Sequence, residues 1–196
     1  MTDALRPPTV DPSALEAATA RFAAEARPDV AYARVESPVG TLVVAATPKG
    51  LVTIAYEDFR GGLDPVLERL ARRLSPRILE QPARLDAVRR ELDEYFAGRR
   101  QAFDVPIDWA LYTPFGRRVL QATARIPFGA TATYGQVAAQ AGNAKASRAA
   151  GRALGANAIP IVVPCHRVIG AGGRLTGYTG GVHRKEALLR IEGVLL

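Results

Sequence analysis

The chain has 196 residues, enough for one medium domain or two small ones with buried cores. Its composition, 48% hydrophobic and 23% charged, is typical of a folded globular protein and excludes wholesale disorder, collagen-like repeats and a disulfide scaffold. No apolar run reaches the roughly 18 residues of a membrane helix, and the N-terminus lacks the basic flank and apolar core of a signal peptide. We therefore expect a cytoplasmic protein with no membrane partner.

The net charge is +7, from 26 Lys and Arg against 19 Asp and Glu. Such an excess on a small protein favours polyanions such as nucleic acid, although charge alone is weak evidence. The single cysteine, Cys165, can form neither an internal disulfide nor a Cys-rich zinc site. If Cys165 has a function, it acts as a lone thiol.

Residues 1–30 are rich in Ala and Pro and form an N-terminal extension. Within it, residues 13–26 predict a short helix that opens with a capping box of Ser13 and Glu16. The rest of the extension carries no pattern that predicts a regular element.

The next elements are a hairpin and two helices. Two β-branched runs, 41–46 and 51–56, flank a turn sequence and predict antiparallel strands. Asp64 with Pro65 supplies an N-cap and first-turn signal for one helix, and residues 85–97 predict another that a glycine ends.

A division of the chain follows from the next signals. Residues 102–108 predict a short strand or linker, and Thr113 with Pro114 then begins a new helix. We therefore divide the chain near Trp109 into an N-terminal part, residues 31–108, with mixed strands and helices, and a helical C-terminal part, residues 109–196.

Residues 133–155 predict two helices around a tight turn. Thr133 and Gln136 form a capping box for the first helix, Gly142 ends it, and Asn143 can cap the second. The second helix ends near a glycine as well. Paired helices of this kind occur in DNA-binding proteins and also in ordinary helical packing.

The second of these helices has one basic face. Lys145, Arg148 and Arg152 recur at i, i+3 and i+7, while alanines and Gly151 keep the helix thin. A thin basic helix can approach a phosphate backbone closely. The commoner explanation of the pattern by itself is a solvated helix in a packed pair.

Cys165 follows a short apolar run, residues 159–163, which predicts a buried strand that delivers the chain to the thiol. The thiolate is the nucleophile, and a free cysteine is mostly protonated at neutral pH, so a reactive thiol needs a base or positive neighbours. His166 and Arg167 can supply both. A buried structural cysteine beside a histidine is nevertheless the commoner case.

The geometry of adjacent residues limits how His166 can serve as the base. Side chains that are neighbours in an extended segment diverge, so a bridging water, rather than a direct hydrogen bond, would join His166 to Cys165. Such a base needs an orienting group, and the acidic candidate is Glu192 near the C-terminus. The glycine-rich residues 176–181 can present backbone N–H donors to a ligand, or form an ordinary surface turn.

Three motifs together carry a family resemblance: PCHRVIG at residues 164–170, TGYTGG at 176–181 and RKEALLRIEG at 184–193. They closely resemble the O6-alkylguanine-DNA alkyltransferases, also called methylated-DNA–protein-cysteine methyltransferases, and the bacterial constitutive branch is nearest. The resemblance is strong from about Tyr112 onward and weaker from about Ala31. Residues 1–30 have no recognised counterpart.

The resemblance implies an α/β plus α fold: a ribonuclease H-like N-terminal α/β domain and a C-terminal winged-helix, or helix-turn-helix, domain. It implies a monomer that binds double-stranded DNA in the minor groove, flips an alkylated guanine out of the stack, and moves the alkyl group irreversibly onto a cysteine. Displacement at a saturated carbon requires a thiolate and a stabilised leaving group, so neither metal nor cofactor is expected.

The resemblance also assigns roles to residues. It implies that Cys165 is the acceptor, His166 the water-relayed base, Glu192 its orienting carboxylate, Asn157 the organiser of the active-site turn, and Tyr134 a donor to the leaving guanine. It makes Arg148 the side chain that enters the vacated stack, with DNA contacts from Lys145, Ala146, Ser147, Gly151 and Arg152. Val168, Tyr178, Thr179 and Lys185 match the substrate pocket.

Two departures from the family pattern concern local packing: Gln121 stands where many relatives carry Trp, and Ala158 replaces a common Pro. The alternatives to an alkyltransferase are a non-catalytic lesion-binding or regulatory DNA-binding protein of the same fold and a cysteine hydrolase. The enzyme is favoured by the joint retention of four residues, because a pure binder has no use for the set: Cys165, His166, Asn157 and Glu192.

Overall fold

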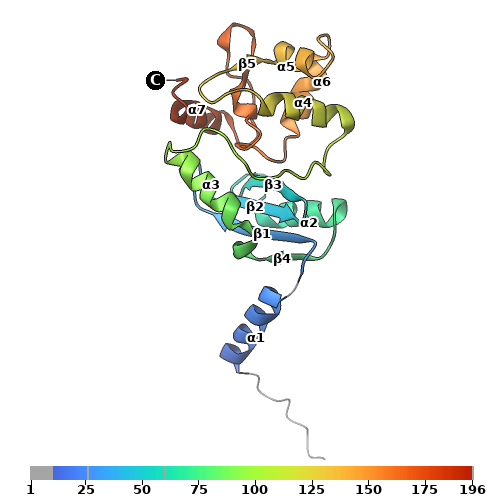
Figure 1. Ribbon diagram of the computed structural model, residues 1–196, viewed down its shortest axis with the longest axis vertical. Coiled ribbons are helices and arrows are strands. Elements are labelled where there is room, and N and C mark those ends of the chain that lie inside the picture. The colour runs from blue at the N-terminus through green and yellow to red at the C-terminus, as the bar shows by residue number, and fades with distance from the viewer. Residues whose placement is uncertain (1–10, 26, 60, 196) are drawn as a thin grey trace, which may run out of the picture.

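The computed structural model describes residues 11–25, 27–59 and 61–195. Figure 1 shows a sheet with its helices in the N-terminal part, the helical C-terminal part stacked on it, and helix α1 (Pro12–Glu25) standing apart from both. Within the described ranges, no helix combines the length and apolar character needed to cross a membrane.

The N-terminal part contains a four-stranded sheet in the order β3-β2-β1-β4. The strands are β1 (Val30–Val35), β2 (Leu42–Thr47), β3 (Gly50–Tyr56) and β4 (Ile78–Glu80). The β2–β3 pair is the predicted hairpin, β1 joins β2 antiparallel, and β4 joins β1 in parallel. Strand β1 begins one residue before the start that we gave to the N-terminal part.

Alternation along the strands gives the sheet two apolar faces. On one face, Val43 and Val52 contact the buried residues Val66 and Leu70 of α2 (Leu63–Arg73). The strand period of two and the helical spacing of four place these side chains opposite one another. Helix α2 therefore covers this face of the sheet.

The opposite face of the sheet joins the two parts of the chain. Leu92 and Tyr95 of α3 (Asp86–Phe96) pack there with Ile54, after the short 3₁₀ helix η1 (Pro82–Leu85). The same apolar cluster continues into the C-terminal part, where it includes Ile159, Val163 and Leu188 among others. One core therefore runs through both parts.

The cap predictions for the N-terminal helices were partly wrong. At α1, the Asp11 carboxylate accepts the Ser13 N–H at 2.9 Å, so Asp11 rather than a Ser13–Glu16 box begins the helix. At α2 the N-cap is Gly62 with φ 87°, and Asp64 lies inside the first turn. Asp64 there faces the positive end of the helix dipole, which also favours an acid.

The C-terminal part is mostly helical. Its helices are α4 (Pro114–Ala124), α5 (Tyr134–Gln140), α6 (Ser147–Gly155) and α7 (Val182–Ile191). Two short parallel strands, β5 (Ala132–Thr133) and β6 (Val168–Ile169), and two 3₁₀ helices, η2 (Cys165–Arg167) and η3 (Ala171–Gly173), complete it. Helices α5 and α6 form the predicted pair around a turn.

In the C-terminal part, the predicted N-caps of α4 and α5 are present, and that of α6 is not. Thr113 accepts the Gly116 N–H at 3.1 Å, and the Thr133–Gln136 capping box is present. Asn143 does not cap α6: the N-cap is Ala146, and the Asn143 side chain accepts the Lys145 N–H at 3.2 Å inside the turn. The turn uses the asparagine before the helix begins.

The strand predicted over residues 159–163 is wrong. The segment is buried but forms tight turns, with Ile161 at φ 74° and a hydrogen bond from the Val163 N–H to the Ile159 carbonyl at 2.9 Å. Pro160 and Pro164 lack the N–H groups that a ladder needs, so the backbone bonds locally. Cys165 consequently begins a 3₁₀ helix instead of ending a strand.

Candidate active site

Cys165 lies at a cavity of about 620 Å³ and is 6% exposed. The Asn157 side-chain amide donates to Cys165 Sγ at 3.1 Å and to the Val163 carbonyl at 2.9 Å, and its oxygen accepts the Ile159 N–H at 3.0 Å. Asn157 therefore holds the turn and the sulfur together, as the resemblance implies for an organiser of the active-site turn.

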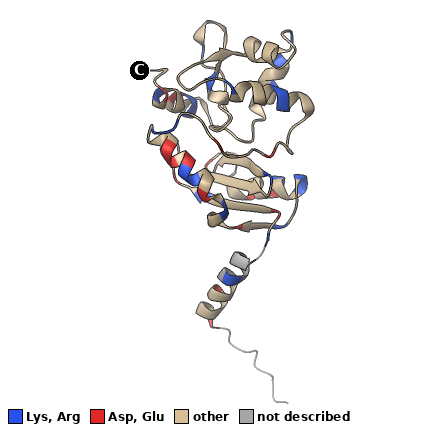
Figure 2. Cartoon of the chain, viewed as in Figure 1, with Lys and Arg blue, Asp and Glu red and all other residues tan. Residues whose placement is uncertain are grey.

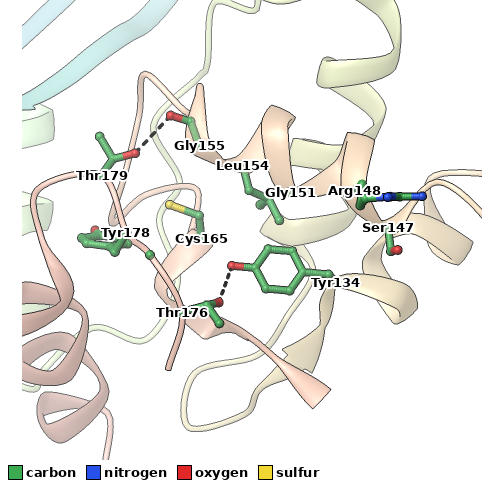
Figure 3. Close-up of a pocket in the computed structure, with 11 residues that line it drawn as sticks. Tyr134, Ser147, Arg148, Gly151, Leu154, Gly155, Cys165, Thr176, Tyr178 and Thr179 are labelled. Atoms are coloured by element: carbon green, nitrogen blue, oxygen red, sulfur yellow. Dashed lines mark hydrogen bonds between the residues drawn. The ribbon is translucent and has the colours of Figure 1, made fainter. Parts of the chain in front are cut away.

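Figure 3 shows the cavity between α6 with Tyr134 on one side and the loop of residues 176–179 on the other. The Tyr134 hydroxyl and the Thr176 hydroxyl are hydrogen-bonded at 2.8 Å. The Thr179 hydroxyl donates to the Gly155 carbonyl, at the end of α6, at 3.3 Å. These two bonds tie the walls of the cavity to each other.

Behind Cys165, Glu192 is buried among three donors. Its Oε1 lies 2.8 Å from His166 Nε2 and accepts hydrogen bonds from Arg167 Nη2 at 2.9 Å and from the Tyr95 hydroxyl at 2.7 Å. Its other oxygen, Oε2, accepts a hydrogen bond from Arg167 Nε at 2.9 Å. Burial opposes ionisation of Glu192, but the hydrogen bonds from His166 and Arg167 outweigh it and lower the pKa to about 2. Glu192 is an anion at neutral pH.

The charge on Glu192 fixes the tautomer of His166. An ionised carboxylate only accepts hydrogen bonds, so Nε2 of His166 carries the proton that it donates. Burial lowers the pKa of His166, which keeps the ring neutral and leaves Nδ1 with a lone pair. Nδ1 is buried and has no hydrogen-bond partner in the part of the chain that the structure describes. Nδ1 is thus the basic atom of the site.

The thiol is protonated in the resting protein. Burial raises the pKa of Cys165 to about 11, against the opposing effects of the Asn157 hydrogen bond and the nearby Lys185 charge. Among the described residues, no hydrogen bond joins Sγ directly to the His166 ring, which agrees with the divergence expected of adjacent side chains. A nucleophilic thiolate at this position would therefore require a base to remove the proton.

Lys185 and Val168 lie behind the cavity wall and do not line the cavity. The Lys185 ammonium is fully buried and donates to the Val168 carbonyl at 2.5 Å and to the Thr176 carbonyl at 3.3 Å. Burial lowers the pKa of Lys185. Lys185 therefore braces the loop that carries Tyr178 and Thr179, both of which do line the cavity.

The basic face of α6 opens onto the cavity mouth. Ser147, Arg148 and Gly151 line the cavity, and Gly151 lies so close to Tyr134 that an added Cβ would be 3.6 Å from its ring. Lys145 is exposed, as is Arg152, which lines a neighbouring groove with Tyr112. The predicted DNA-contacting residues therefore share one end of the molecule, with Ala146 at the N-cap.

Acidic residues are missing from the sequence around this face. No Asp or Glu occurs between Asp108 and Glu186. In Figure 2, α3 carries both signs of charge, whereas α4 and α6 carry only basic charges. Such a one-sign surface attracts a polyanion and leaves its cations free to pair with phosphates.

Two tyrosines of the N-terminal part were missed by sequence reasoning. Tyr95 reaches Glu192 across 97 residues of sequence, and the Tyr56 hydroxyl bonds that of Tyr178 across 122. No local pattern marks either residue as functional. Among the residues that the structure describes, no three His, Cys, Asp or Glu side chains are grouped so that they could hold a metal ion.

Comparison with known proteins gives matches across both parts of the chain. Residues 30–109 match the model of a family described as 6-O-methylguanine DNA methyltransferase, ribonuclease-like domain, and residues 114–194 match that of its DNA binding domain. These matches cover most of the described chain.

Curated relatives and solved structures match over most of the chain. A methylated-DNA–protein-cysteine methyltransferase of Methanosarcina acetivorans is 41% identical over 162 residues, or 83% of this chain and 97% of that protein. One of Mycobacterium bovis is 40% identical over 161 residues, or 82% and 91%. The crystal structures of Mycobacterium tuberculosis O6-methylguanine methyltransferase and of Mycobacterium tuberculosis OGT in complex with DNA each have a TM-score of 0.72, at 39% identity, covering 83% of this chain and 92% of theirs.

Proposed function

The chain belongs to the 6-O-methylguanine DNA methyltransferase family, and we propose that it repairs O6-alkylguanine in DNA by moving the alkyl group onto Cys165. The expected ribonuclease-like N-terminal domain and DNA-binding C-terminal domain are confirmed. The observation that carries the assignment of the acceptor is the position of Cys165 at the cavity, backed by a buried histidine and carboxylate.

The bond changes at Cys165 balance without a further reactant. The Sγ–carbon bond forms as the bond between that carbon and guanine O6 breaks, and the thiol proton ends on the released guanine. His166 Nδ1 takes this proton first, through a bridging water. Because the product is a thioether, whose carbon–sulfur bond water does not cleave, the thiol is not regenerated and each protein molecule reacts once.

The Glu192 cluster makes His166 a usable base. When Nδ1 is protonated, the imidazolium lies 2.8 Å from a carboxylate that is already ionised, so the new charge is stabilised where it forms. Arg167 and Tyr95 hold that carboxylate in place. Catalysis by a positioned base of this kind contributes roughly 10²–10⁴-fold.

Tyr134 acts on the leaving guanine, and Arg148 acts on the DNA duplex. The Tyr134 hydroxyl lines the cavity and can donate to a guanine ring nitrogen as negative charge develops on the leaving group. Arg148, at the cavity mouth on α6, enters the stack that the flipped guanine leaves. The residues of α6 on either side of Arg148 contact DNA phosphates. The protein acts as a monomer in the cytoplasm.

The second candidate, a lesion-binding protein without chemistry, accounts for the α6 surface but not for the buried set behind it. A binder gains nothing from a charged carboxylate held under a thiol, since burial of a charge is costly unless it is paired. Asn157 is hydrogen-bonded to Cys165, and Glu192 is hydrogen-bonded to the next residue, His166; two such pairs at consecutive residues favour transfer.

The deciding experiment is the intact mass of the protein after incubation with a duplex that carries one O6-methylguanine. We expect a gain of one methyl group, located on Cys165 by peptide mapping. The Cys165→Ser variant should bind the duplex with similar affinity and gain no mass, because a hydroxyl is a far poorer nucleophile of nearly the same size. Unmodified wild-type protein that binds the lesion would favour the non-catalytic candidate.

A further inference from the structure

A buried cluster joins the N-terminal part to the wall of the Cys165 cavity. Tyr56, the last residue of β3, is 2% exposed, and its hydroxyl lies 2.9 Å from the hydroxyl of Tyr178. The two rings meet edge to face, with centroids 6.3 Å apart. Tyr178 lines the cavity beside Cys165 (Figure 3), so a residue of the N-terminal part touches the side chain that forms this wall.

Arg184 holds Tyr56 from the other side. Its guanidinium lies 4.4 Å from the centroid of the Tyr56 ring and donates to the Gly180 carbonyl at 2.7 Å and to the Val39 carbonyl at 2.8 Å. A further pair joins it to the Asp58 carboxylate. A buried arginine with this many partners has little freedom, so the ring on which it stacks is fixed too.

The loop backbone is also fitted to Tyr56. Gly180 has φ +100°, a conformation that favours glycine, and a Cβ at this position would collide with the Tyr56 ring. The loop of residues 176–181 can follow its path only because no side chain stands between its backbone and that ring. Tyr56 is therefore in contact with the loop at two points, Tyr178 and Gly180.

We propose that Tyr56 is a positioning residue that limits the size of the alkyl group accepted at Cys165, by holding Tyr178 against the cavity. The inference rests on the proposed function. Tyr178 and Cys165 line the same cavity, so a group attached to Sγ lies in the space that the Tyr178 ring borders. A methyl group leaves Tyr178 where it is. A benzyl group requires the Tyr178 ring to move, which breaks its bond to Tyr56.

The test compares two lesions in one duplex sequence, O6-methylguanine and O6-benzylguanine, by single-turnover rates at saturating DNA. Tyr56→Phe removes the hydroxyl pair and keeps the ring. We expect its benzyl-to-methyl rate ratio to rise about fivefold, the factor that matches a hydrogen bond of about 1 kcal/mol. Loss of general stability would lower both rates and leave the ratio unchanged.

Tyr178→Phe removes the same hydrogen bond from the opposite side and should raise the ratio to a similar degree. The double variant should show no further rise, because both changes break one bond. The matched control is Tyr32→Phe. The Tyr32 hydroxyl donates to the Glu80 carboxylate at 3.3 Å, on the same sheet, so its removal should leave the ratio at the wild-type value.

The inference would be overturned by an unchanged ratio in Tyr56→Phe, or by effects of the two single variants that add in the double variant. If Tyr56→Phe did not fold, Tyr178→Phe alone would decide, since it removes the same bond. Failure of the proposed function has a different signature, because the wild-type protein would then transfer neither group to Cys165.

Discussion

The Glu192 cluster and the exposed face of α6 use charge in opposite ways. Both oxygens of Glu192 are occupied by donors from His166, Arg167 and Tyr95, and the carboxylate is fully enclosed. On α6, by contrast, Arg148 and Arg152 are exposed, and neither forms an ion pair with any residue in the described ranges. The Glu192 carboxylate is buried and has its hydrogen-bond partners within the protein, whereas the arginines of α6 are exposed and have no ion-pair partner among the described residues.

The difference fits the roles that we propose for the two regions. A proton relay needs a fixed orientation, and a buried carboxylate held by four hydrogen bonds is kept from rotating away from its histidine. A surface that binds DNA needs cations whose partners are the phosphates themselves, since a cation already paired within the protein has less to gain from DNA. Variants on the two sides should therefore fail in different assays.

The largest effect should come from Glu192→Gln. The neutral amide can no longer stabilise the imidazolium and leaves the buried Arg167 without its anion, so transfer should slow by about 100-fold or more. Because the defect lies in the chemistry, the rate with free O6-benzylguanine should fall as much as the rate with duplex. The measurement is the single-turnover rate with each substrate.

A matched control for this variant is Glu68→Gln, which removes an exposed carboxylate 3.7 Å from Arg72 and should leave both rates unchanged. A Glu192→Gln protein that reacted normally with the free base would remove Glu192 from the relay. The thermal midpoint of each variant distinguishes loss of folding from loss of chemistry.

The next effect separates the two arginines of α6. Arg148→Ala should slow repair in duplex by about tenfold, because no side chain then fills the vacated stack, while free O6-benzylguanine should react at the wild-type rate. Arg152→Ala should act on affinity and lower the salt slope by about one unit, as expected for loss of a phosphate contact.

Rates at saturating DNA, set beside rates with the free base, decide the roles of these arginines. Equal loss with both substrates in Arg148→Ala would contradict its role as the inserted side chain. So would two variants that cannot be told apart on duplex, since the basic face would then be only an electrostatic anchor.

A smaller effect concerns pH. The pKa of His166 is lowered by burial, so the ring stays neutral as the pH falls through 6.5, its ordinary value, and loses its basicity only further down. The rate with free O6-benzylguanine should therefore be level between about pH 8 and 6.5 and decline below that range.

Tyr95→Phe sharpens this pH test. With one donor fewer, the Glu192 charge acts more strongly on His166 and raises its pKa, so the decline should begin at a higher pH than in the wild type. A profile that keeps its midpoint while its plateau falls would mean that Tyr95 is only structural.

Stability against acid should follow from the carboxylate of the same cluster. Glu192 has a pKa of about 2 in the folded protein against 4.5 for the ordinary side chain, so the folded state favours the ionised form of this side chain. This contribution, about 3 kcal/mol at most, is present above pH 4.5 and is lost as the pH falls toward 2. Urea unfolding across this window should show a smaller loss for Glu192→Gln than for the wild type.

The smallest effect should come from removing residues 1–26. In the described part of this segment, Leu15 is 57% exposed, and α1 stands apart from the sheet. Transfer should stay within about threefold of the full chain, because a short exposed helix adds little. A large loss in a folded truncated protein would show that the extension takes part in the site or in DNA binding.

Sequence reasoning succeeded where the determinants are local. The Thr133–Gln136 capping box and the β2–β3 hairpin depend on residues a few positions apart, and both are present. The motif around Cys165 and the acid at Glu192 also led to residues that the structure brings together. These signals need no knowledge of the tertiary fold.

Sequence reasoning failed where distant contacts or backbone chemistry decide. Residues 159–163 have the apolar character of a strand, but two prolines and the Asn157 side chain close them into turns. Tyr95 and Tyr56 lie in ordinary helix and strand patterns, where a buried tyrosine fills a core position. Only the stacking of the two parts of the chain shows that their hydroxyls reach Glu192 and Tyr178.

The apolar cluster that runs through both parts has a consequence for how the protein matures on the ribosome. The sheet, α2 and α3 can form once about half of the chain has emerged, but the face that carries Ile54 is covered only in part, by α3, until residues such as Ile159 and Leu188 arrive. Tyr95 is made before its partner Glu192, which lies 97 residues further along the chain. A nascent chain therefore passes through a stage with a partly open apolar face and without the Glu192 cluster, which forms only when the segment that carries Glu192 docks.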